Sequence, residues 1–168
     1  MTSDTKLRSR SAESAAAVSR SYDNDFFGWV EDQVALLKAG RVDRIDSINI
    51  ADELAAVGNE HYEKLESAVR IVLLHLLKWD YQPDRRSRSW VLSIAEHRRR
   101  IVRVLRKNPS LKPHIEEATS EAYEDARGDA MNETGLVATT FPQQCPYDCP
   151  AITTRTIEWD DVRSPEQQ

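Results

Sequence analysis

The residues best suited to chemistry lie between His75 and Trp90, where an apolar run meets a basic and aromatic stretch. Pro83 lies in the middle and ends the preceding helix, because proline lacks the N–H that a helix interior needs. If two helices fold back on each other there, aromatic rings, guanidinium groups and a helix N-terminus gather at one pole. Such groups suit an anion or a carboxylate. This candidate surface, the hairpin cluster, consists of His75, Trp79, Tyr81, Gln82, Arg85, Arg86, Ser89 and Trp90.

The hairpin cluster also has a structural interpretation. Its large aromatic side chains can form a plug at the end of a helical bundle, with the arginines paired to acids on neighbouring helices. His61 and His97 fall on apolar helix faces, where a hydrogen-bonded structural histidine is the more common case. His61 and His75 are fourteen residues apart, roughly 21 Å along one helix, so they cannot share a metal ion.

Sequence motifs for catalysis are absent. The chain contains no GxSxG motif, no phosphate-binding glycine loop and no Glu-x-x-His pair of the di-iron type. Asp52 and Glu53 are adjacent, so their carboxylates point in different directions, and neither has a matched partner for acid–base work. If the hairpin cluster binds a ligand, His75 is the candidate acid or base. Otherwise we predict no catalytic residue, no cofactor and no metal site.

Two neighbouring segments carry opposite charge. Residues 84–112 contain ten Lys and Arg against two acids, and residues 116–168 contain twelve acids against three Arg. The basic residues of the predicted third helix are Arg98, Arg99, Arg100, Arg103, Arg106 and Lys107. A basic helix can enter a groove of DNA, but these residues wrap around most of the helix. Salt bridges to the acidic helix that follows are therefore expected, with nucleic-acid binding as the less favoured alternative.

The elements that position these residues follow from hydrophobic spacing and capping signals. A first helix is predicted from about Asp23 to Gly40, a glycine suited to ending it. Asp46 is expected to cap a second helix, in which apolar residues recur at alternating spacings of three and four as far as Trp79. That helix would be roughly 50 Å long, so a bend or break near Gly58 is expected.

Two further helices are predicted after the turn. The third begins at Ser87 or Ser89 and stops before Pro109. Ser110 is expected to cap the fourth, with Pro113 in its first turn, where the missing N–H costs nothing. The pattern as a whole predicts an all-α fold, a bundle of about four helices.

The flanking segments differ from the helical body. Residues 1–21 hold almost no large apolar side chains and are predicted to be a disordered leader. The bundle is expected to span residues 22–146. The chain loses its periodicity after Gly135, and residues 147–168 are predicted to form an irregular tail, with Phe141 and Trp159 as anchors.

Composition limits the class of protein. The 168 residues carry a net charge of −5, which disfavours general attraction to nucleic acid or anionic lipid. The longest apolar run is far shorter than the ~20 residues of a membrane span, and no signal-like segment is present, so a cytoplasmic location is expected. Cys145 and Cys149 are too few for a zinc site. They are expected to stay thiols, with a local disulfide as the alternative.

Several sequence motifs occur in a characteristic order. They are YDNDFFGWVEDQVALLKAGRVDRID, the ADEL stretch after it, HLLKWDYQPDRRSRSW, NPSLKPH, EAYEDARGDAMNETGL and FPQQCP. Together they resemble the bacterial domain-of-unknown-function family 29, from Tyr22 to Pro146. The resemblance implies a compact all-helical domain, and it supplies no activity, cofactor or site residue. The chain departs from the family's usual ending, because Cys149, Pro150 and a Thr-rich stretch come before Trp159.

We therefore expect an uncharacterised, non-catalytic helical module that acts by contact with another protein or with itself. The alternative is a protein or enzyme that binds a small anion or a nucleotide through the hairpin cluster. No contact with a membrane is expected.

Overall fold

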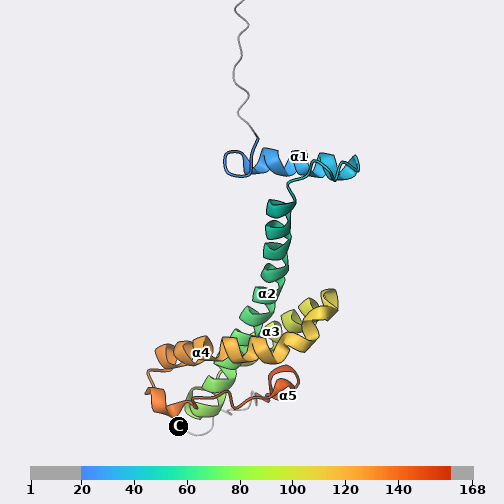
Figure 1. Cartoon of the computed structure of the whole chain (residues 1–168). Coiled ribbons are helices and arrows are strands. Elements are labelled where there is room, and N and C mark those ends of the chain that lie inside the picture. The colour runs from blue at the N-terminus through green and yellow to red at the C-terminus, as the bar shows by residue number, and fades with distance from the viewer. Residues whose placement is uncertain (1–19, 160–168) are drawn as a thin grey trace, which may run out of the picture. The chain divides into compact units, whose positions relative to one another are not determined.

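Helices make up the regular structure of the described residues, 20–159, which contain no β-strand. The computed structural model has four long helices, α1 (Phe26–Lys38), α2 (Ser47–Tyr81), α3 (Arg88–Lys107) and α4 (Ile115–Thr134), and a short one, α5 (Cys149–Thr153) (Figure 1). The described 3-10 helices are Pro83–Arg85, Pro109–His114 and Ala138–Thr140. The predicted all-α fold with about four main helices is confirmed. The predicted disordered leader falls almost wholly outside the described residues.

The chain divides into two compact units, and the boundary lies within α2. The N-terminal unit ends at Leu54 and the C-terminal unit begins at Ala55. The part of the predicted tail that the structure describes, residues 147–159, belongs to the C-terminal unit. The sequence-based limits at residues 21 and 146 stay a prediction.

Local capping sets both ends of α1. Asp25, two residues after the predicted Asp23, is the N-cap, and its carboxylate accepts a hydrogen bond from a backbone N–H of the first turn at 2.9 Å. Gly40 has a φ of 69°, a left-handed conformation that glycine adopts without strain. Its N–H and the next one bind the carbonyls of Leu37 and Leu36, which is a Schellman ending. The predicted role of Gly40 is confirmed.

The N-terminal unit has a very small interior. Trp29, 4% exposed, is the only large hydrophobic side chain buried among its described residues. Tyr22 packs edge-on against Trp29 with ring centroids 5.0 Å apart, and the indole N–H donates to Asp46 at 3.2 Å. Asp46 also caps α2 as predicted, by accepting from the Asn49 N–H at 3.3 Å. One carboxylate thus ties α1 to the start of α2.

Three helices share the core of the C-terminal unit. Their buried side chains repeat on successive turns. α2 contributes large aliphatic groups and α4 contributes mostly alanines, whose small size allows α4 to pack closely on α2. The core side chains from these helices include Leu65, Val69, Val72, Leu73, Leu76 and Leu77 of α2, Ile94 and Ile101 of α3, and Ala118, Ala122, Tyr123, Ala126 and Ala130 of α4. The predicted seam of α2 is therefore buried from Leu65 to Trp79, whereas its earlier members Ala55 and Gly58 are exposed.

Side-chain contacts establish the order of the three helices. α2 and α3 form an antiparallel hairpin, so that the Nζ of Lys78 near the end of α2 lies 4.5 Å from the ring centroid of Trp90 at the start of α3. Contacts between α2 and α4 advance in the same order along both helices: Arg70 pairs with Asp129 at 2.8 Å, and Lys78 pairs with Glu133 further along. α4 therefore packs on α2 in a parallel sense.

α2 continues without interruption through Gly58, so the break considered there does not occur. Residues 55–60 are all exposed, and a Cβ atom added at Gly58 would meet no atom within 4 Å. Backbone hydrogen bonds keep this exposed stretch regular, and at its end Glu60 pairs with Lys64 one turn later.

The start of α4 also differs from the prediction. Ser110 and Pro113 lie in a 3-10 helix, and the N-cap of α4 is His114. Two prolines within this six-residue segment remove N–H donors and fix φ, which favours a short, tightly wound piece over a regular helical start. The end of α4 agrees with the prediction, because Gly135 has a φ of 70°.

Candidate functional site

The hairpin cluster is partly assembled around two indole rings. Trp79 is buried, and Arg86 lies over its ring with the guanidinium carbon 4.8 Å from the ring centroid. The Nε of Arg86 also donates to the Trp79 carbonyl at 2.9 Å. Trp90 is half-buried and carries the Nζ of Lys78 on its face. Each indole therefore has a cation against its face, Arg86 of the turn against Trp79 and Lys78 of α2 against Trp90.

The remaining cluster residues divide between the interior and the surface. Tyr81 packs edge-on against Phe141 with centroids 5.5 Å apart, and Gln82 is half-buried. Arg85 and Ser89 are exposed. Arg86 is also exposed. Its contacts are with a ring and a carbonyl, and among the described residues it forms no ion pair with an acid of a neighbouring helix.

His75 is half-buried within α2. Its Nδ1 atom is buried and has no hydrogen-bond partner in the described structure. Burial, and to a smaller extent the charge of Lys78, lower the pKa of His75 to about 4, while Glu133 acts in the opposite direction. The imidazole is therefore neutral at pH 7, and a base this weak is poorly matched to proton transfer near neutrality.

Asp80, a residue outside the predicted cluster, joins α2 to the tail. Arg155 donates to both carboxylate oxygens at 2.7 Å, and the Tyr147 hydroxyl donates at 2.9 Å. Burial raises the pKa of Asp80, but the hydrogen bonds from Arg155 and Tyr147 outweigh burial and leave the pKa lowered. The partners are 67 and 75 residues away in sequence, so no local pattern could have revealed them.

The tail is docked on the C-terminal unit through backbone as well as side chains. Arg98 of α3 donates to three backbone carbonyls in and just after α5, two of them at 2.7 and 2.9 Å. Phe141 is buried, and Trp159 packs edge-on against Trp79 with centroids 6.4 Å apart. The tail therefore contributes to the core, as the predicted anchors Phe141 and Trp159 indicated.

The predicted salt bridges between α3 and α4 are not found. Among residues 20–159, the ion pair that involves α3 is internal to that helix, Arg99 with Glu96 at 2.6 Å. The acids of α4 contact α2 instead, as Asp129 and Glu133 do. The prediction was wrong because it assumed that helices adjacent in sequence neutralise each other, whereas α4 packs its acidic side chains beside the cations of α2.

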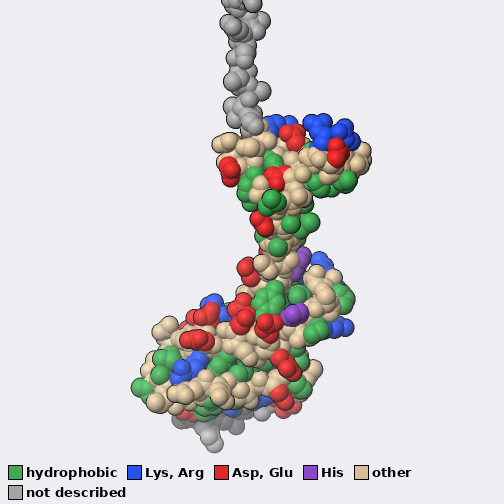
Figure 2. Space-filling model, viewed as in Figure 1, with side chains coloured by type: hydrophobic (Ala, Val, Ile, Leu, Met, Phe, Trp, Pro, Cys, Tyr) green, Lys and Arg blue, Asp and Glu red, His purple; other side chains and the backbone are tan. Residues whose placement is uncertain are grey.

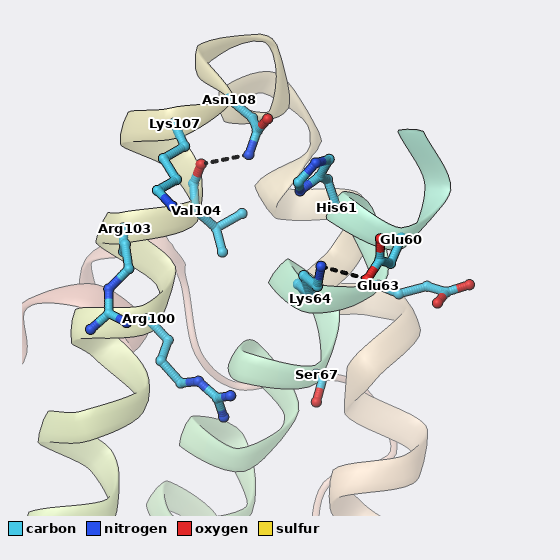
Figure 3. Close-up of a pocket in the computed structure, with 10 residues that line it drawn as sticks. All are labelled: Glu60, His61, Glu63, Lys64, Ser67, Arg100, Arg103, Val104, Lys107 and Asn108. Atoms are coloured by element: carbon cyan, nitrogen blue, oxygen red, sulfur yellow. Dashed lines mark hydrogen bonds and ion pairs between the residues drawn. The ribbon is translucent and has the colours of Figure 1, made fainter. Parts of the chain in front are cut away.

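A groove of about 470 Å³ lies between α2 and the C-terminal half of α3 (Figure 3). Its walls, here called the basic groove, are Glu60, His61, Glu63, Lys64 and Ser67 of α2, and Arg100, Arg103, Val104, Lys107 and Asn108 of α3. Arg100, Arg103 and Lys107 recur at spacings of three and four, which places them on one helix face. Lys64 pairs with Glu60 at 2.6 Å. Figure 3 shows Arg100 extending from α3 toward α2.

The basic groove is not among the sites predicted from the sequence. The sequence predicts His61 to be a structural histidine and the α3 cations to be partners for α4. The spacing of Arg100, Arg103 and Lys107 was a usable signal, but the identity of the opposite wall depends on the hairpin register.

Other kinds of site can be assessed in the same part of the chain. Within residues 20–159, no group of three or more His, Cys, Asp or Glu is placed to hold a metal ion. Cys145 and Cys149 are unpaired thiols, both half-buried, and burial raises the pKa of Cys145. No helix in this range is both long enough and apolar enough to cross a membrane.

Comparison with known proteins identifies a family. No curated protein and no solved structure matches the chain. The model of a family described as a domain of unknown function, DUF29, matches residues 21–157. The match takes in all four long helices and also the docked tail, past Pro146 where the sequence resemblance ended. The chain therefore belongs to the DUF29 family.

Proposed function

We propose that this protein is a non-catalytic interaction module that associates with a second copy of itself through its N-terminal unit. The supporting observation is exposed apolar surface: seven of the eleven exposed large hydrophobic side chains described belong to this unit. They are Phe26, Phe27, Val34, Leu37, Val42, Ile48 and Leu54. Figure 2 shows hydrophobic side chains at the surface of this unit. Large exposed apolar patches commonly mark protein-interaction sites.

Three exposed residues of α1, together with the half-buried Val30, form a regular row. Phe27, Val30, Val34 and Leu37 follow one another at spacings of three, four and three, the pattern of a helix that packs against another helix. Phe27 is 74% exposed and Leu37 is 46% exposed. We call these four residues the α1 row. Trp29 is the only large hydrophobic side chain buried among the described residues of this unit. Such a unit gains little from its own core, so a partner helix would add the burial that it lacks.

A second copy of α1 is the partner that the row itself favours. The spacing of three, four and three is the same in both chain directions, so an antiparallel copy would place Leu37 opposite Phe27 and Val34 opposite Val30. This is an isologous contact, in which one surface satisfies both copies and the assembly closes as a dimer.

Light scattering coupled to size exclusion tests the proposal on the full chain. The native protein should show a mass that rises toward a dimer with concentration, and Val34→Glu should stay monomeric while its helical circular dichroism is retained. Val137→Glu is the matched control, because Val137 is 69% exposed in the C-terminal unit. A native protein that is monomeric at all concentrations, or an equal effect of both substitutions, would contradict self-association. Binding of a different protein would then have to be tested separately.

The alternative, binding of a small anion or nucleotide by the hairpin cluster, has less support from the geometry. Arg86 is engaged with Trp79, and the weakly basic His75 is unsuited to acid–base work near pH 7. Arg85 and Arg86 are both exposed, and Arg85 is the one without a contact to Trp79. A ligand of this surface should raise the melting temperature of the native protein, since it binds only the folded state, and Arg85→Ala should reduce that rise.

A further inference from the structure

The basic groove has a net positive lining, because its walls hold four Lys or Arg residues against two Glu. Arg100, Arg103 and Lys107 are exposed along one wall. Among residues 20–159, none of the three forms an ion pair with a carboxylate, and the ion pair at the groove is that of Lys64 with Glu60. The acids Asp129 and Glu133 of α4 could compensate these cations, but they pair with Arg70 and Lys78 of α2 instead.

This arrangement works against the stability of α3 by itself. Like charges three or four residues apart on a helix repel each other, and the row contains two such pairs, Arg100 with Arg103 and Arg103 with Lys107. The helix dipole favours a cation in the last turn, which accounts for Lys107. It does not account for Arg100 and Arg103, which lie one to two turns earlier. An anion held from outside the helix would relieve the repulsion.

The dimensions and lining of the basic groove suit a small ligand. Its volume of about 470 Å³ lies within the range of roughly 300–1,000 Å³ usual for small-molecule sites. Guanidinium groups bind phosphate oxygens in a two-pronged fashion, and Lys64 and Ser67 on the opposite wall add an ammonium and a hydroxyl. Glu60 and Glu63 on that wall would repel a phosphate backbone running through the groove. A compact anion held near α3 avoids them.

We propose that the basic groove binds a small phosphate-bearing anion with two or more negative charges. Arg100 and Arg103 hold the phosphate oxygens, Lys107 adds attraction from the end of α3, and Ser67 donates a hydrogen bond from α2. This site is separate from the α1 row, and neither proposal depends on the other.

Thermal shift and calorimetry with pyrophosphate and ATP test this directly in a phosphate-free buffer at low ionic strength. Pyrophosphate should raise the melting temperature of the full chain, and the variant Arg100→Ala with Arg103→Ala should weaken binding at least tenfold. Free of ligand, this variant should melt at the native temperature or above it, because repulsion is removed. Arg100→Gln with Arg103→Gln keeps the test valid if the alanine pair does not fold.

The control removes the same charge elsewhere. Arg44→Ala with Arg88→Ala takes away two exposed arginines that belong to neither the basic groove nor the hairpin cluster and should leave pyrophosphate binding unchanged. Loss of binding in this control, no effect of the Arg100 and Arg103 variants, or no binding by the native protein would each overturn the proposal. So would binding only to a single-stranded RNA oligonucleotide, with affinity that grows with length and falls steeply with salt.

Discussion

The two units of this protein use apolar residues in opposite ways. In the C-terminal unit, Leu73 and Leu76 of α2 are fully buried, whereas in the N-terminal unit Phe27 and Ile48 are 74% and 75% exposed. Both units are helical and both include part of α2, so helix propensity does not separate them. The comparison shows that an amphipathic helix acquires a core only where other helices cover its apolar face.

The largest difference in unfolding free energy between the two units is expected from a Leu→Ala substitution made once in each unit's part of α2. Leu76→Ala removes a fully buried side chain and should cost about 2–5 kcal/mol of unfolding free energy. Leu54→Ala acts on a side chain that is 66% exposed and should change stability by no more than about 0.5 kcal/mol. Urea denaturation followed by circular dichroism measures both. Equal losses would mean that the N-terminal unit has a core of its own.

Acid should weaken the C-terminal unit selectively. His75 has a folded pKa of about 4 against about 6.5 when unfolded. Since the unfolded chain binds the proton more tightly, stability should fall as the pH drops from about 6.5 to about 4, by up to about 3 kcal/mol. His75→Leu should flatten this dependence in urea titrations at several pH values. The N-terminal unit contains no histidine, so a native pH response of the same size in His75→Leu would disprove the assignment.

Loss of the ion pair between Asp80 of α2 and Arg155 of the tail should have a moderate effect confined to the C-terminal unit. The Asp80 side chain is 26% exposed and that of Arg155 is 35% exposed, so Asp80→Ala should cost about 1–3 kcal/mol. Limited proteolysis should then cut the chain between Tyr147 and Trp159 faster. Arg155→Ala should have a similar effect, and the double variant should cost less than the sum of the two. Full additivity would show that the two side chains act independently.

The smallest effect on stability is expected from substitution of the two glycines that end α1 and α4, which have nearly the same backbone conformation. Gly40 and Gly135 have φ values of 69° and 70°, and a Cβ at either would meet no atom within 4 Å. Alanine at either position should therefore cost about 1 kcal/mol through backbone strain alone. Hydrogen exchange should detect Gly40→Ala as faster exchange around the end of α1, and Gly135→Ala as lower stability of the whole C-terminal unit. A global effect of Gly40→Ala would show that the units unfold together.

Much of the fold could be predicted because the relevant signals act over a few residues. Gly40, Asp46 and Gly135 occupy the caps that their types favour, and the apolar spacing of α2 matches its buried side from Leu65 to Trp79. The start of α4 was missed because Ser110 has the type of an N-cap, while two nearby prolines decide the local hydrogen bonding. The candidate sites were less predictable. The partners of Asp80 and the opposite wall of the basic groove depend on which helices meet.

Amino-acid order alone was enough to settle the helical class, the ends of most helices and the side of α2 that faces inward, since capping and periodic burial are short-range effects. Only the tertiary structure decided how the charges are used. The acids of α4 pair with α2, and Arg100 and Arg103 keep no described counter-ion, because charge pairing follows the packing order and register of the helices and not their order along the chain.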